Sequence, residues 1–214
     1  EGKMCGNGIR CVGKFLYDHG MVDINEKDEI TIETLSGIKK LKAYTSGGKV
    51  NRLRVDMGKA ILDPKEIPVV LDGDKVVDRP VEIAGKNYNI TCVSMGNPHC
   101  VVFMDDIDNL DIETVGPKFE NDKLFPERVN TEFVTVLDDH TIKMRVWERG
   151  SGETWACGTG ACAVAVAACE NGFCKKGEDI KIKLKGGDLI INYTDETVYM
   201  TGNAEKVFEG EVEV

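Results

Sequence analysis

Apolar residues fill every side of one short segment, 161–169, which reads Ala-Cys-Ala-Val-Ala-Val-Ala-Ala-Cys. A helix that is apolar all round must be buried on all sides, and its small side chains let a sheet wrap it closely. A second helical stretch places its apolar side chains on one stripe only: Ile9, Val12, Phe15 and Leu16. We therefore predict one central, buried helix and one amphipathic helix that is only partly enclosed.

Most of the remaining chain alternates between apolar and polar residues, as half-buried strands do. The segments 30–37 and 180–187 each form an alternating strand that ends in a turn, and a second strand leaves each turn. Further strands are expected at 81–83, 88–93, 101–104, 132–137 and 141–148, with one more helix at 112–121. Many strands with few helices indicate an α+β fold.

The chain contains an internal repeat. Cys5-Gly6-Asn7-Gly8 and Cys157-Gly158-Thr159-Gly160 both read Cys-Gly-x-Gly, and each opens a helical stretch that stops fifteen residues after the cysteine, at Gly20 and Gly172. The alternating strand and turn then follow in both copies. Two copies of one supersecondary unit imply a duplicated fold with a pseudo-two-fold axis.

The two copies of the repeat are preceded by very different lengths of chain. About ninety residues of strand-rich sequence separate the end of the first copy from the second motif, whereas four residues precede the first motif. We therefore expect the chain to be a fragment or processed product of a longer protein, whose intact mass would test this. The expected domains are 1–58 with 203–214, as the remainder of an N-terminal domain, and 59–202.

Composition and charge narrow the class of protein. The 214 residues include 27 Lys and Arg against 37 Asp and Glu, a formal net charge of −10, which argues against nucleic acid as a partner. No segment reaches the roughly 18 consecutive apolar residues of a membrane span. The eight cysteines include no Cys-x-x-Cys pair, so zinc and thioredoxin-type sites lack their signature. A reducing cytoplasm is the simplest setting, and no metal or other cofactor is expected.

A cysteine at a helix start has a chemical meaning. The positive end of the helix dipole and the unpaired N–H groups favour a thiolate, so we expect the pKa of Cys5 and Cys157 to fall toward neutrality. The neighbouring glycines allow a ligand carboxylate to approach those N–H groups. Two such cysteines across one cleft would suit proton transfer between the two faces of a carbon, one as thiolate base and the other as thiol acid.

Four motifs in order resemble the diaminopimelate epimerase family: Met-Cys-Gly-Asn-Gly-Ile-Arg-Cys at 4–11, Gly-Asn-Pro-His at 96–99, Glu-Arg-Gly at 148–150 and Ala-Cys-Gly-Thr-Gly-Ala-Cys-Ala at 156–163. The resemblance implies two pseudo-symmetric domains, each a curled, mainly antiparallel sheet or barrel around a central helix. It also implies a cofactor-independent epimerase that interconverts LL- and meso-2,6-diaminopimelate in lysine biosynthesis.

The resemblance also assigns roles to particular residues. Cys5 and Cys157 are the acid/base thiols, and His99 and Glu148 orient or tune them. The substrate contacts are Gly6, Asn7, Asn97, Asn130, Glu148, Arg149, Gly158 and Thr159. The family's N-terminal substrate-contacting asparagines have no counterpart in this sequence, so the activity of the chain alone is a separate question. Five other cysteines, at 11, 92, 162, 169 and 174, are expected to be buried apolar fillers.

Two alternatives remain open. A proline or hydroxyproline racemase also pairs two cysteines, although Asn7 and the Glu148-Arg149-Gly150 triplet favour the epimerase. A redox or binding protein could instead use Cys5 and Cys157 as a switchable disulfide. The expected partner is a small-molecule substrate, without nucleic acid or membrane, and a homodimer is possible for such folds.

Overall fold

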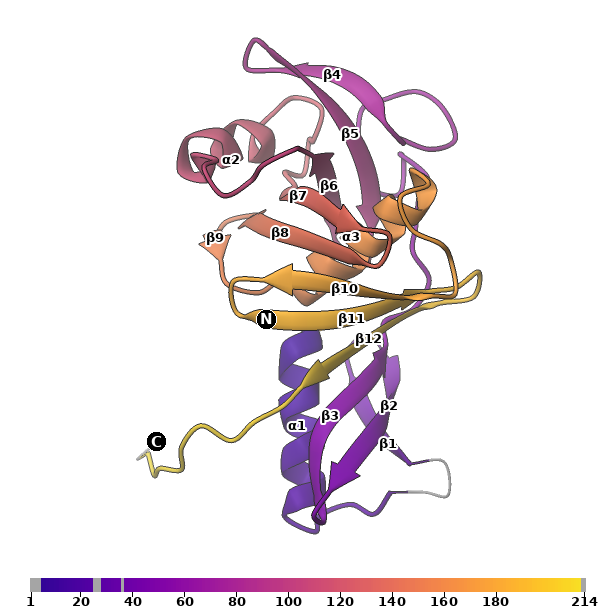
Figure 1. Cartoon of the computed structure of the whole chain (residues 1–214), viewed down its shortest axis with the longest axis vertical. Helices are drawn as coiled ribbons and strands as arrows, with labels where there is room; N and C mark the ends of the chain where they lie inside the picture. Colours follow the sequence, from indigo (N-terminus) through magenta and orange to yellow (C-terminus); the bar gives the residue numbers. More distant parts are fainter. Residues whose placement is uncertain (1–4, 25–27, 36, 213–214) are drawn as a thin grey trace. The chain divides into compact units, whose positions relative to one another are not determined.

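A computed structural model describes residues 5–24, 28–35 and 37–212 of the chain (Figure 1). Met4 of the first motif lies outside these residues. The chain divides into two compact units, one made of 1–56 with 201–214 and the other of 57–200. The described helices include none that is long and apolar enough to cross a membrane.

The first unit packs one helix on an antiparallel meander. Helix α1 (Gly6–Asp18) is followed by strands β1 (Glu29–Thr34), β2 (Gly37–Ser46) and β3 (Lys49–Asp56), which pair in that order. The helix contacts β2 and β3. Gly13 permits this approach, because a Cβ there would lie 2.9 Å from a Leu53 methyl and 3.0 Å from one of Leu41. Tight packing of α1 therefore depends on one small residue of its buried face.

The second unit is a larger mixed sheet. Its strands lie in the order β4-β5-β6-β7-β8-β10-β11, followed by the first residues of β12, and β9 pairs with β8. Neighbours are antiparallel in most pairs, but β6 with β7 and β8 with β10 are parallel. The strand bounds are β4 Arg79–Ile83, β5 Lys86–Ser94, β6 Pro98–Phe103, β7 Asn130–Asp138, β8 Thr141–Glu148, β9 Gly152–Thr154, β10 Asp179–Leu184, β11 Gly187–Tyr193 and β12 Val198–Asn203.

Two helices cover this sheet. Helix α3 (Gly158–Glu170) contacts β5, β6, β7, β10 and β11, which curve around it (Figure 1). Helix α2 (Ile112–Glu120) packs against β7, β8 and β9. Its Phe119 belongs to an apolar cluster between α2 and the sheet, where its ring lies edge-on to that of Phe133 of β7, with 5.3 Å between the ring centroids. Strand β7 is therefore covered on both faces, and its first five residues are all buried.

The predicted fold class, α+β and mostly β, is confirmed, and so are the two kinds of helix. Residues 161–168 of α3 are all fully buried, whereas Val12 and Phe15 of α1 are about half exposed. The two hairpins match in register: Thr34 pairs with Gly37, and Leu184 with Gly187. Both glycines have positive φ, 95° and 127°, which a residue without Cβ adopts readily.

Candidate active site

The two repeat cysteines have the same local geometry. Each is the N-cap of a thirteen-residue helix, with φ −133° and ψ 109° at Cys5 and φ −124° and ψ 109° at Cys157. The Cys5 sulfur accepts from the Gly8 N–H at 3.3 Å, and the Cys157 sulfur from the Gly160 N–H at 3.4 Å. Each thiol thus takes the capping place that Ser, Thr, Asp or Asn usually occupies.

The helix starts that carry these cysteines are suited to bind an anion. Neither first turn contains an acidic residue, so the positive end of each helix dipole is not neutralised locally. Gly6 and Asn7 lie in the first turn of α1, and Gly158 and Thr159 in that of α3. The buried Oδ1 of Asn7 has no hydrogen-bond partner among the described residues. A carboxylate is the natural ligand for such backbone N–H groups.

The surroundings of the two sulfurs differ within their own units. Cys5 is exposed in the first unit, whereas Cys157 is 6% exposed in the second. Burial raises the pKa of Cys157 to about 12, and the nearby charges of Glu132 and Glu148 add to this. The Thr159 hydroxyl and the Gly160 N–H act in the opposite direction but are outweighed. The predicted fall of the Cys157 pKa is therefore wrong, because burial and the two carboxylates outweigh the effect of the helix start.

A chain of hydrogen bonds leads away from Cys157. Its sulfur lies 3.5 Å from Thr159 Oγ1, which accepts from Asn97 Nδ2 at 3.3 Å. Asn97 Oδ1 is 3.1 Å from His99 Nε2, and His99 Nδ1 is 2.7 Å from Glu132 Oε1. Both His99 and Glu132 are fully buried. The predicted residues Asn97, His99 and Thr159 thus form one network with the predicted thiol.

The Asn130 side chain is hydrogen-bonded to the backbone of Arg149. The Asn130 side chain donates to the Pro98 carbonyl at 2.9 Å and accepts from the Arg149 N–H at 2.9 Å. It therefore ties the start of β6 to the turn after β8. The Arg149 guanidinium donates to the Glu127 carbonyl at 2.8 Å. Glu148, whose charge acts on Cys157, accepts a hydrogen bond from the Thr154 hydroxyl, which holds one of its carboxylate oxygens in place.

A buried carboxylate on α2 holds the same turn. Glu120 is 6% exposed and accepts from Trp147 Nε1 at 2.7 Å, from the Gly150 N–H at 2.9 Å and from Arg128 Nη1 at 3.0 Å. These three donors lock the end of β8 and the turn that carries Arg149 onto the helix. Gly116 allows the contact, because a Cβ there would lie 2.4 Å from the Trp147 ring.

The predicted site residues fall into two groups. Cys5, Gly6 and Asn7 belong to the first unit, and the other eight belong to the second. In the second unit His99 lies on β6, Asn130 on β7 and Glu148 on β8, with Asn97 just before β6 and Arg149 just after β8. Cys157, Gly158 and Thr159 lie at the start of α3. Sequence reasoning missed Glu132 and Glu120. The sequence offers one signal for Glu132, a charged residue that stands directly before the apolar residues Phe133 and Val134 of β7. For Glu120 the chain offers no comparable signal.

The filler prediction holds for Cys92, Cys162 and Cys174, which are buried, whereas Cys169 is partly exposed and Cys11 is exposed. Cys100, which that prediction did not include, is also buried. The prediction is therefore wrong for Cys11. This thiol lies on the side of α1 that borders a groove, rather than on the face packed against β2 and β3.

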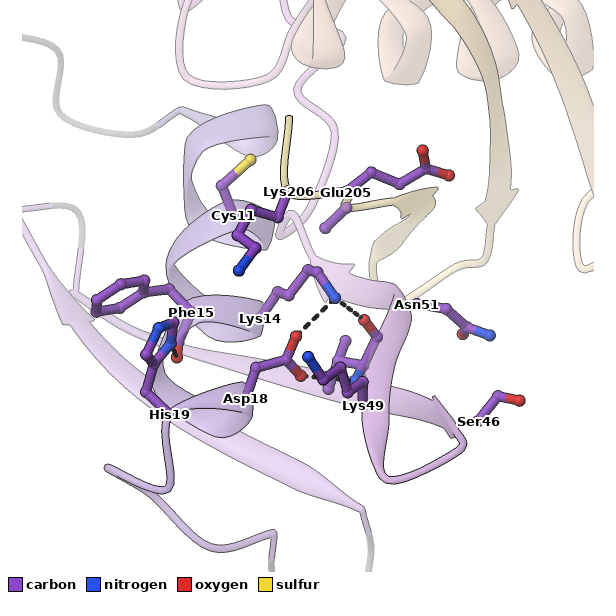
Figure 2. Close-up of a pocket in the computed structure, with 12 residues that line it drawn as sticks. Cys11, Lys14, Phe15, Asp18, His19, Ser46, Lys49, Asn51, Glu205 and Lys206 are labelled. Carbon is purple, nitrogen blue, oxygen red and sulfur yellow. Dashed lines mark hydrogen bonds and ion pairs between the residues drawn. The ribbon is translucent and has the colours of Figure 1, made fainter. Parts of the chain in front are cut away.

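That groove runs beside the later turns of α1 and has a volume of about 530 Å³ (Figure 2). Lys14 spans its floor, donating to Asp18 at 2.7 Å and to the Val50 carbonyl. Cys5, Gly6 and Asn7 do not line it. The groove is thus separate from the helix start on which the predicted chemistry depends. Across the described residues, no cluster of three or more His, Cys, Asp or Glu side chains is placed to hold a metal ion.

Solved structures of other proteins share this architecture. A probable proline racemase from Agrobacterium radiobacter matches with a TM-score of 0.75 at 16% identity, over 99% of this chain and 68% of its own. At that identity the likeness shows that the two proteins share a fold.

Sequence comparison is more specific. The family model for diaminopimelate epimerase matches residues 1–62 and 91–207. A diaminopimelate epimerase from Agathobacter rectalis is 51% identical over 100% of this chain and 76% of the relative, and one from Acetivibrio thermocellus is 53% identical over 100% and 75%. The chain belongs to the diaminopimelate epimerase family.

Proposed function

We propose that the chain interconverts LL- and meso-2,6-diaminopimelate, with Cys5 and Cys157 as the two acid/base groups and without a cofactor. The observation that carries this proposal is the matched pair of N-cap thiols in a chain about 50% identical to diaminopimelate epimerases. The names of these relatives are the reason for the proposed substrate, and the repeated Cys-Gly-x-Gly motif is the reason for assigning both thiols to one reaction. Lysine biosynthesis follows as the pathway.

The proposed reaction moves one proton off the α-carbon and puts another on. A thiolate removes the α-hydrogen from one face, and the electron pair remains on carbon, delocalised into the α-carboxylate. The opposite thiol then donates its proton to the other face, leaving a thiol where the thiolate was and a thiolate where the thiol was. The reverse reaction exchanges the roles, so the sum is one inverted centre and no net oxidation.

Stabilising the carbanion is the demanding step, because an amino-acid α-proton is far less acidic than a thiol. Fixed dipoles in a dry site stabilise developing charge without reorganising. We assign this task to the first-turn N–H groups at Gly6, Asn7, Gly158 and Thr159, with the α-carboxylate as their ligand. Asn97, Glu148 and Arg149 would contact the remaining amino and carboxylate groups, and Asn130 supports Arg149 through its backbone contact.

The raised pKa of Cys157 bears on its own role in the proposed cycle. Because the pKa of Cys157 is raised to about 12, this residue is a thiol at neutral pH and can donate a proton. In that half of the cycle Cys5 would serve as the thiolate. Glu132 and Glu148 raise the Cys157 pKa and so favour its acid form.

The two units would be the two epimerase domains, with residues 1–58 and 203–214 forming part of the N-terminal one and 59–202 the C-terminal one. Helix α1 supports this, since one side of it borders an open groove whereas strands surround α3. A further β layer on α1 would make the units alike. All eight cysteines are free thiols, in keeping with a reducing cytoplasm. A homodimer stays a prediction.

The test follows α-hydrogen exchange by NMR in D2O, with reductant and without pyridoxal phosphate or metal. Exchange at LL-diaminopimelate but not at proline would support the proposal. The chain should be assayed alone and together with the part of the Acetivibrio thermocellus relative that its match leaves out. Silence on both substrates, from folded protein with free thiols, would contradict it.

A further inference from the structure

Glu132 lies at the centre of the second unit and has no predicted role. Its side chain is fully buried on β7, and Oε1 lies 2.7 Å from Nδ1 of the equally buried His99. Its second oxygen, Oε2, is buried without a hydrogen-bond partner among the described residues. A carboxylate in such a place costs stability, because a buried pair often gains less from attraction than its groups lose in hydration. A residue kept at that cost merits a functional explanation.

The carboxylate also touches the start of α3. A Cβ on Gly160 would lie 2.6 Å from Glu132 Oε1 and 3.2 Å from the Cys157 sulfur. Both groups therefore lie against the same backbone carbon, and Glu132 reaches the first turn of α3 without contacting the protein surface. It is too deeply buried to bind substrate, so any effect on the reaction must pass through other groups.

The hydrogen bonds define how that effect passes. Asn97 turns its Nδ2 to Thr159 and its Oδ1 to His99, so His99 Nε2 must carry a hydrogen. The short contact between His99 Nδ1 and Glu132 then holds one further proton. At the other end, Thr159 Oγ1 accepts from Asn97, which leaves its own hydrogen free to point at the Cys157 sulfur. The tautomer of His99 thereby sets the direction of every bond up to the thiol.

We propose that Glu132 is a positioning residue for Cys157, acting by fixing the tautomer and orientation of His99, and through Asn97 those of the Thr159 hydroxyl. This inference rests on the role proposed above for Cys157. The charges that face the sulfur come from two neighbouring strands, Glu132 on β7 and Glu148 on β8, and both raise the Cys157 pKa. Glu132 therefore keeps the thiol protonated as well as oriented.

Two substitutions separate orientation from charge. In Glu132→Gln the side-chain amide can still donate to His99 Nδ1, so the Nε2 hydrogen and the bond direction are kept. The carboxylate that raises the Cys157 pKa is lost together with the proton that it shares with Nδ1. In Glu132→Leu neither the bond direction nor the carboxylate is kept. Glu153→Gln is the matched control, because Glu153 pairs with Arg145 and Lys185 and takes no part in the chain from Cys157 to Glu132.

The first readout uses the resting protein without substrate. Iodoacetamide labelling over a range of pH, resolved by peptide mass spectrometry, gives the midpoint for Cys157, with Cys5 and Cys11 as internal references. We expect Glu132→Gln to move the Cys157 midpoint to lower pH, with the references and the Glu153→Gln control unmoved. A purely structural glutamate would leave that midpoint where it is. An unshifted midpoint in folded Glu132→Gln overturns the inference.

The second readout is the state of His99 by nitrogen-15 NMR, assigned with a His99→Gln variant. Wild type and Glu132→Gln should both show a hydrogen on Nε2, whereas Glu132→Leu should show a mixture of tautomers. An unchanged His99 spectrum in Glu132→Leu overturns the inference.

Kinetics supply the third readout. We expect kcat to fall less than about tenfold in Glu132→Gln and at least about a hundredfold in Glu132→Leu, with KM within about threefold because Glu132 does not touch substrate. A wild-type kcat in Glu132→Leu overturns the inference. If wild type exchanges no α-hydrogen of diaminopimelate, the proposed function fails, yet the labelling and NMR results still decide whether Glu132 positions Cys157.

Discussion

Helices α1 and α3 begin with the same four-residue pattern and meet different surroundings. Their N-cap cysteines agree in backbone angles and in the N–H bond to sulfur. Yet α1 carries an exposed thiol, whereas the thiol of α3 is buried, and its burial and the charges of two carboxylates raise its pKa. The local sequence thus determines the geometry of the cap, and strands distant in the chain determine the chemistry of the sulfur.

The largest expected effect concerns the thiols themselves. Cys157→Ala should lower epimerisation of diaminopimelate by about 10³-fold or more without unfolding the chain, because it removes one of two proton-transfer groups. Cys5→Ala should do the same, while Cys11→Ala, an exposed cysteine outside the site, should not. Chiral chromatography of the product and circular dichroism give the measurements. Turnover retained in Cys157→Ala would end the two-thiol assignment.

The raised pKa of Cys157 predicts a dependence of stability on pH. The thiol ionises near its ordinary value of 9.0 in the unfolded chain but at about 12 in the folded one. Between these values the folded state holds one more proton, so the free energy of unfolding falls as pH rises, by about 1.4 kcal/mol per pH unit.

Urea unfolding between pH 9 and 11 tests this prediction. Cys157→Ala should show a shallower fall than wild type by that amount, since all other groups are common to both proteins. Equal slopes would show that the buried sulfur does not titrate as its surroundings imply.

Substituting Gly8 or Gly160, the glycine three residues after each cysteine, tests how the surroundings of the two helix starts differ. A Cβ at Gly160 would overlap Glu132, whereas one at Gly8 would meet the Cys5 sulfur at 3.4 Å, an ordinary contact. Gly160→Ala should therefore cost about 1–3 kcal/mol of unfolding free energy. Gly8→Ala should stay within about 1 kcal/mol of wild type, since alanine favours the helix. Denaturant titration distinguishes them, and equal costs would contradict the contrast between the two helix starts.

The smallest expected effect concerns the glycine that follows each helix, a feature that the two repeats share. Gly20 and Gly172 follow the two helices with φ of 65° and 78°, and neither would place a Cβ within 4 Å of another group. Alanine at either position should cost about 1–2 kcal/mol, from backbone conformation alone. Thermal unfolding of the two variants should give similar losses. A marked inequality would show that the helix ends are not equivalent.

Much of this fold follows from short-range patterns. The helix with small apolar side chains, the matched hairpins and strand β8 are all visible as periodicity in the sequence. Strand β7 is also visible, at 132–137, but its burial is not, because α3 and the apolar cluster on α2 cover both of its faces. A charged residue in an alternating strand would ordinarily face solvent, whereas Glu132 is fully buried.

The candidate site divides in the same way. Cys5 and Cys157 stand out because a repeated motif marks them, and the resemblance to the family adds Asn97, His99 and Arg149. The pKa of Cys157 could not be read from its own helix, because the carboxylates that raise it lie on β7 and β8. Glu120 escaped notice because its partners, Trp147 and Gly150, come together only in the folded chain.

The central claim is that two thiols act on opposite faces of one carbon, and isotope incorporation during the first turnovers tests it most directly. LL-diaminopimelate is incubated in D2O and the reaction is stopped early. A two-thiol mechanism predicts that the meso product carries deuterium at the inverted carbon while the recovered LL substrate still carries protium, because the donating thiol has exchanged with solvent. Deuterium appearing equally in recovered substrate and product from the first turnovers would point to a single base and contradict the two-thiol mechanism.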